Sequence, residues 1–463
     1  MNIILYKRCT TIFAMLMVFC AIPRGYAADY YVSTKGNDGS KGTSELSPWR
    51  TVKRVNSQAF YPGDSIHFRC GDFWYEVLTL RSKGTSEKPI IYTSYGKGEK
   101  PNIGEIYYRK YLGEATWNVL DSIAILGYNN HGIDIQDINN FTIKKCKIEG
   151  CNRSGIVAEN CSDLLVEDTE ILNTKERGTW VTNGERVVFR RVTASYCGIR
   201  SDLINQDGIV VGSGRNCIID SCIAHHNLKE GSSGIDTGGN AGDSIIIKNC
   251  LTYKNGPNGI SIQGGIDYKA QVINCISVDN RVGIDTGNEC NVTISNNTIF
   301  NNSDIGINLG SNGNHVVTNN ILWNNGKTND GTGANISFPE DTSQGKLISD
   351  YNCIQEQPGA NTIYLKKHGV HTFSEWRSFG EKKFDQHSIN KDPLFKRTDS
   401  IYSSRYYELQ KNSPAINAGN NDFVILETDY RDFKRIRMDN VDMGAIEYGG
   451  PQVVQDVQVI YIH

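Results

Sequence analysis

A short unit repeats about eight times through the middle of this chain, and it limits the folds open to the sequence. Each copy contains Gly followed by Ile or Thr, and successive copies are spaced by 23, 23, 30, 26, 25, 24 and 23 residues. A second, alternating element advances with the first and ends in Cys or a small polar residue. Two series that advance together indicate one structural unit used repeatedly. The copies begin at Gly132, Gly155, Gly178, Gly208, Gly234, Gly259, Gly283 and Gly306.

Each unit contains three short runs with the alternation of a strand, as in 283–286, 292–295 and 298–300, separated by turns rich in Asn and Gly. No stretch within the repeat has helical periodicity. Three strands per turn, stacked in parallel at about 4.8 Å, predict a right-handed parallel β-helix. We expect a signal peptide over 1–27, an N-terminal cap with irregular coils over 28–110, regular coils over 111–355, a C-terminal capping segment over 356–450 and a tail over 451–463.

The first 27 residues resemble an export signal, with basic Lys7 and Arg8, an apolar stretch, and Gly25-Tyr-Ala27 as a cleavage site. No later segment reaches the roughly 20 apolar residues that span a bilayer. The sequence therefore predicts an exported monomer, periplasmic or extracellular, without a membrane span. A formal net charge of −3 and a pI near 6.3 argue against a nucleic-acid partner.

The cysteines follow the repeat. Of 13 cysteines, two lie in the expected signal, which leaves an odd number of 11. No CxxC pair, HExxH motif or Cys/His cluster with zinc spacing occurs, so we expect no thiolate-bound metal. Their phase predicts an inward stack of buried side chains, in which two asparagines continue the cysteines: Cys146, Cys222, Cys250, Cys275, Asn297 and Asn320.

Motifs at both ends carry a family resemblance. The opening YYVSTKGNDG, SPWRTV and PGDSIHF, the Gly-Ile and Asn-Cys coils, the DPLF at Asp392 and the closing SPAINAG and VDMGAIEY resemble exported bacterial β-helix proteins of the pectate-lyase-like superfamily. The resemblance covers nearly the whole mature chain. It implies the fold, whereas the superfamily includes lyases, hydrolases, epimerases and proteins without known activity.

Loops that break the coil length are where function is expected in a solenoid. The 30- and 26-residue spacings place insertions at 196–207 and 225–233, and loops leaving the Gly-Ile strand are enlarged at 237–243 and 263–269. We expect a cleft there. With Ile pointing inward, the next residue points outward, which predicts an outward series of Asp134, Val157, Trp180, Val210, Asp236, Ser261, Asp285 and Asn308.

The acidic residues of this region can be interpreted as catalytic carboxylates or as caps of surface turns. Asp236 and Asp285 lie two coils apart, about 9.6 Å by strand spacing, at the upper limit for an inverting glycosidase. Asn205-Gln-Asp207-Gly208 resembles the Asn-x-Asp-Gly element of polygalacturonases, in which the Asp is catalytic. The later elements of that family are absent, since Asn258 stands in place of its histidine. The alternative is that these carboxylates cap turns at the surface.

Elimination needs a base and a cation that neutralises a uronate carboxylate. Arg200 and Lys229 are candidates for the base or clamp, with Lys254 and Lys269 as further substrate-binding candidates. His226 is a candidate acid or base, and Trp180 could stack on a sugar ring. The carboxylates Asp202, Asp207, Glu230 and Asp236 have the hard oxygens that Ca²⁺ prefers.

These residues favour an enzyme that cleaves an acidic, uronic-acid-containing polysaccharide, by β-elimination in preference to hydrolysis. The candidate catalytic residues are Asp207, Asp236, Lys229, Arg200, His226 and Asp285, and the candidate substrate-binding residues are Asn205, Trp180, Lys254 and Lys269. Ca²⁺ is the candidate cofactor, and no organic cofactor is expected. An inverting glycoside hydrolase, and a non-catalytic β-helix that binds glycans or serves as a structural spine, remain the alternatives.

Overall fold

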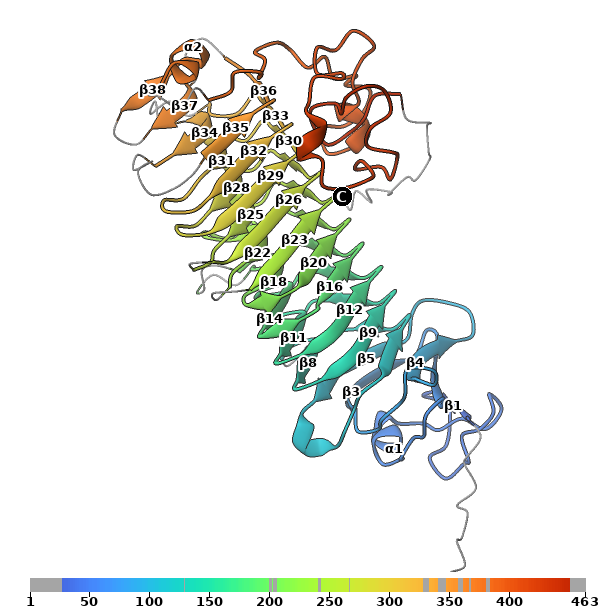
Figure 1. The fold of residues 1–463 in the computed structure, drawn as a ribbon. Helices are drawn as coiled ribbons and strands as arrows, with labels where there is room; N and C mark the ends of the chain where they lie inside the picture. Colours follow the sequence, from blue (N-terminus) through green and yellow to red (C-terminus); the bar gives the residue numbers. More distant parts are fainter. Residues whose placement is uncertain are drawn as a thin grey trace, which may run out of the picture.

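A computed structural model describes residues 27–449, except 129, 200, 201, 203–205, 240–242, 266, 328–332, 340–346, 357–360, 366–367 and 380–383. The expected signal peptide and the tail at 451–463 lie outside the described residues. The chain winds into a long stack of coils, each built from up to three strands, and strands of successive coils pair in parallel (Figure 1). Within the described residues, no helix is long and apolar enough to cross a membrane.

Sheet A runs along one side of the stack. Its strands are β1 (Asp29–Val32), β2 (Ser65–Arg69), β4 (Ile90–Tyr95), β6 (Asn118–Asp121), β9 (Asn139–Lys144), β12 (Ser162–Glu167), β16 (Val188–Arg190), β20 (Cys217–Asp220), β23 (Ser244–Lys248), β26 (Lys269–Ile273), β29 (Asn291–Ser295), β32 (His315–Thr318) and β35 (Leu347–Asp350), with β15 (Gly184–Glu185) and β19 (Gly214–Arg215) beside them.

Two further rows of strands complete each coil. Row B contains β7 (Ala124–Ile125), β10 (Lys147–Glu149), β13 (Glu170–Leu172), β17 (Thr193–Ser195), β21 (Ile223–His225), β24 (Leu251–Tyr253), β27 (Ile276–Val278), β30 (Thr298–Phe300), β33 (Ile321–Trp323) and β36 (Cys353–Ile354). Row C contains β3 (Phe73–Thr79), β5 (Asn102–Tyr108), β8 (Ile133–Gln136), β11 (Ile156–Glu159), β14 (Thr179–Thr182), β18 (Ile209–Val211), β22 (Ser233–Thr237), β25 (Asn258–Ile262), β28 (Val282–Thr286), β31 (Ile305–Asn308), β34 (Ala334–Phe338) and β37 (Asn361–Leu365), to which β38 (Gly369–His371) adds antiparallel.

The few helices lie outside the regular coils. They are α1 (Val52–Asn56), η1 (Lys110–Leu112), α2 (Phe373–Arg377), η2 (Ser404–Tyr407) and η3 (Asn421–Phe423). The short helix expected near 51–57 is α1, and the Thr51 hydroxyl caps it by accepting from the Arg54 N–H at 3.0 Å. The Glu76 carboxylate of β3 accepts from the first two N–H groups of α1, so the N-terminal cap is joined to row C.

The turn between sheet A and row B explains the repeated Asn-Cys and Asn-Asn pairs. Asn249, Asn274 and Asn296 adopt the left-handed conformation, with φ of 55°, 55° and 57°, which Asn tolerates better than most residues. The next residue then points inward. Cys250, Cys275 and the other stacked residues are fully buried, as the sequence predicts. All described cysteines are free thiols, and only Cys70 is not fully buried.

Asparagines extend this stack by bonding from coil to coil. The Asn297 amide oxygen accepts from the Cys275 N–H at 2.8 Å, and its NH₂ group donates to the Val272 carbonyl at 2.8 Å and to Asn320 Oδ1 at 3.0 Å. A second ladder, which the repeat analysis missed, runs along the turn from row B to row C. It comprises Asn227, Asn255, Asn280, Asn302 and Asn325.

Replacing a ladder asparagine is expected to cost stability. Asn297→Ala removes the acceptor of a buried N–H and the donor to two carbonyls, so we expect a loss of about 1–3 kcal/mol in the free energy of unfolding. The measurement is urea unfolding followed by circular dichroism. Asn314→Ala is the matched control because Asn314 is exposed. Equal stability of the two variants would show that the ladder does not hold the coils.

The C-terminal segment, residues 384–449, folds back along the C-terminal coils and covers the outer face of row B from β24 to β36 (Figure 1). Phe395, Tyr407, Met443 and Ile446 of this segment are buried against row B, and the row B side of the contact comprises Leu251, Tyr253, Ile276, Val278, Phe300, Ile321 and Trp323. This packing covers row B from β24 to β36 and leaves the outer face of row C uncovered by the segment.

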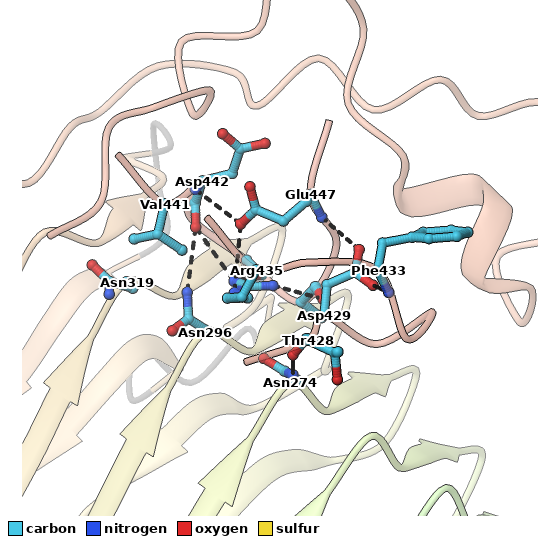
Figure 2. A network of polar contacts seen from close by, with 12 residues as sticks. Asn274, Asn296, Asn319, Thr428, Asp429, Phe433, Arg435, Val441, Asp442 and Glu447 are labelled. Atoms are coloured by element: carbon cyan, nitrogen blue, oxygen red, sulfur yellow. Dashed lines mark hydrogen bonds and ion pairs between the residues drawn. The ribbon is translucent and has the colours of Figure 1, made fainter. Parts of the chain in front are cut away.

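The same left-handed asparagines fasten the segment to the coils (Figure 2). Asn274 Nδ2 donates to the Thr428 carbonyl at 2.8 Å, Asn296 Nδ2 donates to the Asp442 carbonyl at 3.3 Å, and Asn319 bonds both backbone groups of Asn420. The asparagines that adopt the left-handed conformation in these turns therefore also bind the C-terminal segment.

Candidate active site

Two columns of side chains run along the outer part of row C because its strands pair in register. The residue two places after the repeat glycine forms one column, and the register connects Val210, Asp236, Ser261, Asp285 and Asn308 in successive strands. The residue just before the glycine forms the other column, in which Arg177, Asp207 and Ser233 are consecutive. Asp207 and Asp236 therefore come from adjacent coils of row C, and Asp236 is among the charges that shift the pKa of Asp207.

Asp207 is a buried carboxyl group, 3% exposed. Its Oδ1 accepts from the Ser233 N–H at 2.5 Å. Burial, and then the charge of Asp236, raise the pKa of Asp207 from 3.8 to about 7, although the Ser233 N–H and Arg177 favour the charged form. At neutral pH this group can therefore donate a proton as well as accept one.

Asp236 is the second member of the pair. Burial also raises the pKa of Asp236, against the opposing effects of a hydrogen bond with Ser261 and the charge of Arg177, while Asp285 raises it further. Asp285 is half-buried, and its Oδ1 accepts from Asn308 Nδ2 at 2.6 Å. The pKa of both carboxyl groups is therefore raised, and the negative charge of Asp236 adds to the effect of burial on Asp207.

Arg177 completes this arrangement, and the sequence analysis missed it. Its guanidinium lies over the Trp180 ring at 4.8 Å, and its charge lowers the pKa of both aspartates. The repeat contained the signal: Arg177 precedes Gly178 just as Asp207 precedes Gly208, so the two side chains are one strand apart, about 4.8 Å by spacing. The site therefore combines two carboxyl groups with raised pKa values, a cation and a half-buried aromatic ring.

The folded protein is expected to lose stability as the pH rises, because Asp207 keeps its proton to a higher pH when folded than when unfolded. This contribution is fully present below about pH 4, the ordinary pKa, and is lost as the pH approaches 7, by on the order of 4 kcal/mol. Urea unfolding between these pH values measures the slope, and Asp207→Asn should flatten it. Asp163→Asn should leave it unchanged, since Arg186 lowers the pKa of the half-exposed Asp163 out of this range. An unaltered slope in Asp207→Asn would contradict this picture of the site.

Comparison with known proteins identifies the fold family. The family model of the Pel9A-like right-handed β-helix region matches residues 30–329. The chain belongs to this family. Pectate lyase Pel9A shares 15% identity with it at a TM-score of 0.55, over 92% of this chain and 98% of that one. The GH136 lacto-N-biosidase from Eubacterium ramulus shares 14% identity at a TM-score of 0.40, over 74% and 66%.

A lacto-N-biosidase of Bifidobacterium longum subsp. longum is 36% identical over 76 residues. The match covers 15% of this chain and spans only 5% of the length of that protein. Together with the strand pairing, the family assignment makes the fold a right-handed parallel β-helix, which confirms the prediction from the repeat.

Other residues that the sequence predicts to be catalytic or substrate-binding lie away from Asp207 and Asp236. His226 stacks on Tyr196 at 5.0 Å, its Nδ1 lies 2.8 Å from His225 Nδ1, and burial, then the charge of Lys254, lower its pKa. Lys254 lies over the Tyr402 ring of the C-terminal segment at 4.9 Å. These two residues thus belong to an aromatic cluster at the edge of row B.

The remaining candidates are spread over other surfaces. Lys269 begins β26 and is exposed on sheet A, while the half-buried Lys229 and the exposed Glu230 lie in the loop before β22. Asp202 is exposed, and Arg200 and Asn205 lie outside the described residues. Among the residues that the structure describes, no group of three or more His, Cys, Asp or Glu side chains could hold a metal ion. The calcium ligand set therefore stays a prediction.

Proposed function

We propose that this protein cleaves a uronic-acid-containing polysaccharide by β-elimination on the outer face of row C. The proposal rests on Asp207 and Asp236, which come from adjacent coils, whose pKa values are raised by burial, and which both interact with the charge of Arg177. Elimination gives each of these groups a task, whereas hydrolysis leaves the cation without one. The similarity of fold to pectate lyase Pel9A is consistent with this substrate class.

The steps can be assigned to named atoms. Arg177 pairs with the carboxylate of the sugar on which the new double bond forms and stabilises the negative charge that develops there. The Asp236 carboxylate takes the proton from the carbon next to that carboxylate, the carbon–oxygen bond to the neighbouring sugar breaks, and a carbon–carbon double bond forms. The Asp207 carboxyl group gives its proton to the departing oxygen. The pair ends with one proton, as it began, and no water is consumed.

The surroundings fit a polymeric substrate. The Trp180 ring lies beside Arg177 on the same face and offers a surface for a sugar ring. Export, expected from residues 1–27, fits a polymer that cannot enter the cell. The product would carry an unsaturated uronate at one new end and a reducing sugar at the other.

The second candidate is hydrolysis by paired carboxylates, and one observation favours it. Asp236 and Asp285 are separated by a single strand in one column, about 9.6 Å by strand spacing, which leaves room for an attacking water in an inverting enzyme. Hydrolysis yields reducing ends without a double bond.

One experiment separates the two chemistries. The purified protein is incubated with polygalacturonate, alginate and hyaluronan, with Ca²⁺ or with a chelator. The ultraviolet absorbance of the unsaturated uronate and the number of reducing ends are measured on the same samples. We expect both signals to rise. A rise in reducing ends without a rise in absorbance would favour hydrolysis. No rise in either signal on any polymer would favour the non-catalytic alternative. Activity that is lost in chelator and restored by Ca²⁺ would support the predicted calcium site.

Replacing Arg177 tests its role. Arg177→Met is expected to lower kcat/KM on polygalacturonate by about 10²–10³-fold, because the developing charge on the carboxylate is no longer stabilised. The loss should be smaller on methyl-esterified polygalacturonate, in which the carboxyl group is already uncharged. Arg215→Met, an exposed arginine of β19, is the control. Equal losses on the two polymers would contradict the pairing of Arg177 with a uronate.

A further inference from the structure

Three exposed tyrosines lie on or next to the first three strands of row C. Tyr75 of β3 is 76% exposed, Tyr128 in the turn that enters β8 is 48% exposed, and Tyr111 in η1, just after β5, is 79% exposed. Large aromatic side chains left in water in one region mark a binding surface more often than chance exposure. The proposed cleavage chemistry uses none of them.

Two of these rings form one supported surface. The Tyr75 and Tyr128 ring centroids are 5.5 Å apart, and the planes are inclined by 36°. Phe73 packs edge-on against both, at 4.3 Å from Tyr75 and 5.9 Å from Tyr128. Phe73 thereby holds the two exposed rings in place without covering them, so that little conformational freedom is lost when a ligand binds.

Tyr111 is held beside the same column that carries Trp180 and Asp236. The Tyr111 hydroxyl lies 3.3 Å from the Tyr107 hydroxyl, and the Arg109 guanidinium lies over the Tyr107 ring at 4.7 Å. Both oxygens of the buried Asp134 accept from Arg109 Nη2 at 2.9 Å, which fixes that guanidinium. An arginine stacked on an aromatic ring thus occurs twice on this face, here and at Arg177 with Trp180.

We propose that Tyr75, Tyr128 and Tyr111 form a second glycan-binding site, at which the polysaccharide cleaved at Asp207 and Asp236 is held at a distance from the bond that breaks. The site rests on the proposed function for its ligand. The register runs from Tyr107, whose hydroxyl lies next to that of Tyr111, through Asp134 and Val157 to Trp180. Tyr111 therefore lies beside the column that carries Asp236. Five strand steps separate β5 from β22, about 24 Å.

The chemistry of the rings favours a glycan. A tyrosine offers an apolar face with a polar hydroxyl at its edge, which matches a sugar ring with its C–H face and surrounding hydroxyl groups. The arginine here is neutralised by Asp134, so stacking rather than a uronate charge is expected to dominate. A polymer long enough to reach both regions gains from two contacts, whereas a short oligosaccharide at the cleavage site does not.

The test measures binding without turnover. Tyr75→Ala/Tyr128→Ala, and separately Tyr111→Ala, are made in an Asp207→Asn background and run in native gels that contain polygalacturonate, alginate or hyaluronan. We expect the dissociation constant to rise by about tenfold or more in the double variant. Tyr61→Ala is the matched control, because Tyr61 is 61% exposed but lies in the N-terminal cap before β2, outside row C. Unfolding curves show whether each variant is folded.

The outcomes separate this site from the cleavage chemistry. Unchanged retardation of the double variant, or a parent protein that no polymer retards, overturns the proposal. A wild-type protein that cleaves polymer while the tyrosine variants bind normally leaves the proposed function standing and removes the second site. If the tyrosine variants lose binding and the wild-type protein shows no turnover, the glycan site is supported and the proposed cleavage is contradicted.

Discussion

Asp207→Asn is expected to lower the rate of polysaccharide cleavage by about 10²–10⁴-fold while the protein stays folded. The asparagine has nearly the same shape, and its oxygen can still accept from the Ser233 N–H, as the carboxylate does at 2.5 Å. It cannot give a proton to the departing oxygen. The initial rate of product formation on the polymer that responds in the panel measures the effect.

Its controls separate chemistry from folding. Asp236→Asn should cause a loss of similar size, and the double variant should be little worse than either single one, because the two groups act as a unit. Asp163→Asn replaces a half-exposed aspartate that pairs with Arg186 and should leave the rate unchanged. Turnover by Asp207→Asn within a few-fold of the wild-type rate would remove Asp207 from the chemistry.

Arg435→Met is expected to destabilise the C-terminal segment by about 3–5 kcal/mol, because it leaves buried carboxyl groups without their counter-charge. Arg435, Asp429, Asp442 and Glu447 are each no more than 2% exposed (Figure 2). Arg435 Nη1 donates to the Ala445 carbonyl at 3.0 Å, and Nε lies 3.5 Å from Glu447 Oε1. Burial raises the pKa of Glu447 to about 8, against the opposing charge of Arg435.

Two measurements check this prediction. Urea unfolding gives the loss of stability, and limited proteolysis shows whether cleavage begins within residues 384–449, as expected if the segment leaves row B. Arg437→Met is the matched control, since Arg437 is exposed two residues away and should change stability by less than about 0.5 kcal/mol. A stable, protease-resistant Arg435→Met protein would mean that apolar packing alone holds the segment.

Local patterns were sufficient to predict the coils. The Gly-Ile phase predicts which side chains point inward, and the strand register bears this out at Ile235, Ile260 and Ile284, which are fully buried. The prediction of exposure was wrong at three of the outward positions, since Asp134, Val210 and Ser261 are only 7%, 4% and 3% exposed. The Val210 N–H, for example, donates to Thr179 Oγ1 of the neighbouring coil. A side-chain bond of this kind between two coils is not visible in a repeat alignment.

Contacts between distant segments could not be predicted in this way. The docking of residues 384–449 on row B depends on matching shapes more than 100 residues apart, as in the contact of Asn319 with Asn420, and no periodic signal marks it. The burial of Asp207 is similarly a property of the assembled face. Arg177 was accessible to sequence reasoning, because aligning the residue before each glycine places it beside Asp207.

The most direct test of the central claim is the structure of the Asp207→Asn protein with a bound uronate oligosaccharide. We expect the oligosaccharide to lie on the outer face of row C, with a carboxylate against Arg177, a sugar ring on Trp180 and a glycosidic oxygen next to residue 207. An oligosaccharide bound on sheet A, or at the edge of row B near His226, with the Asp236 region unoccupied, would contradict it.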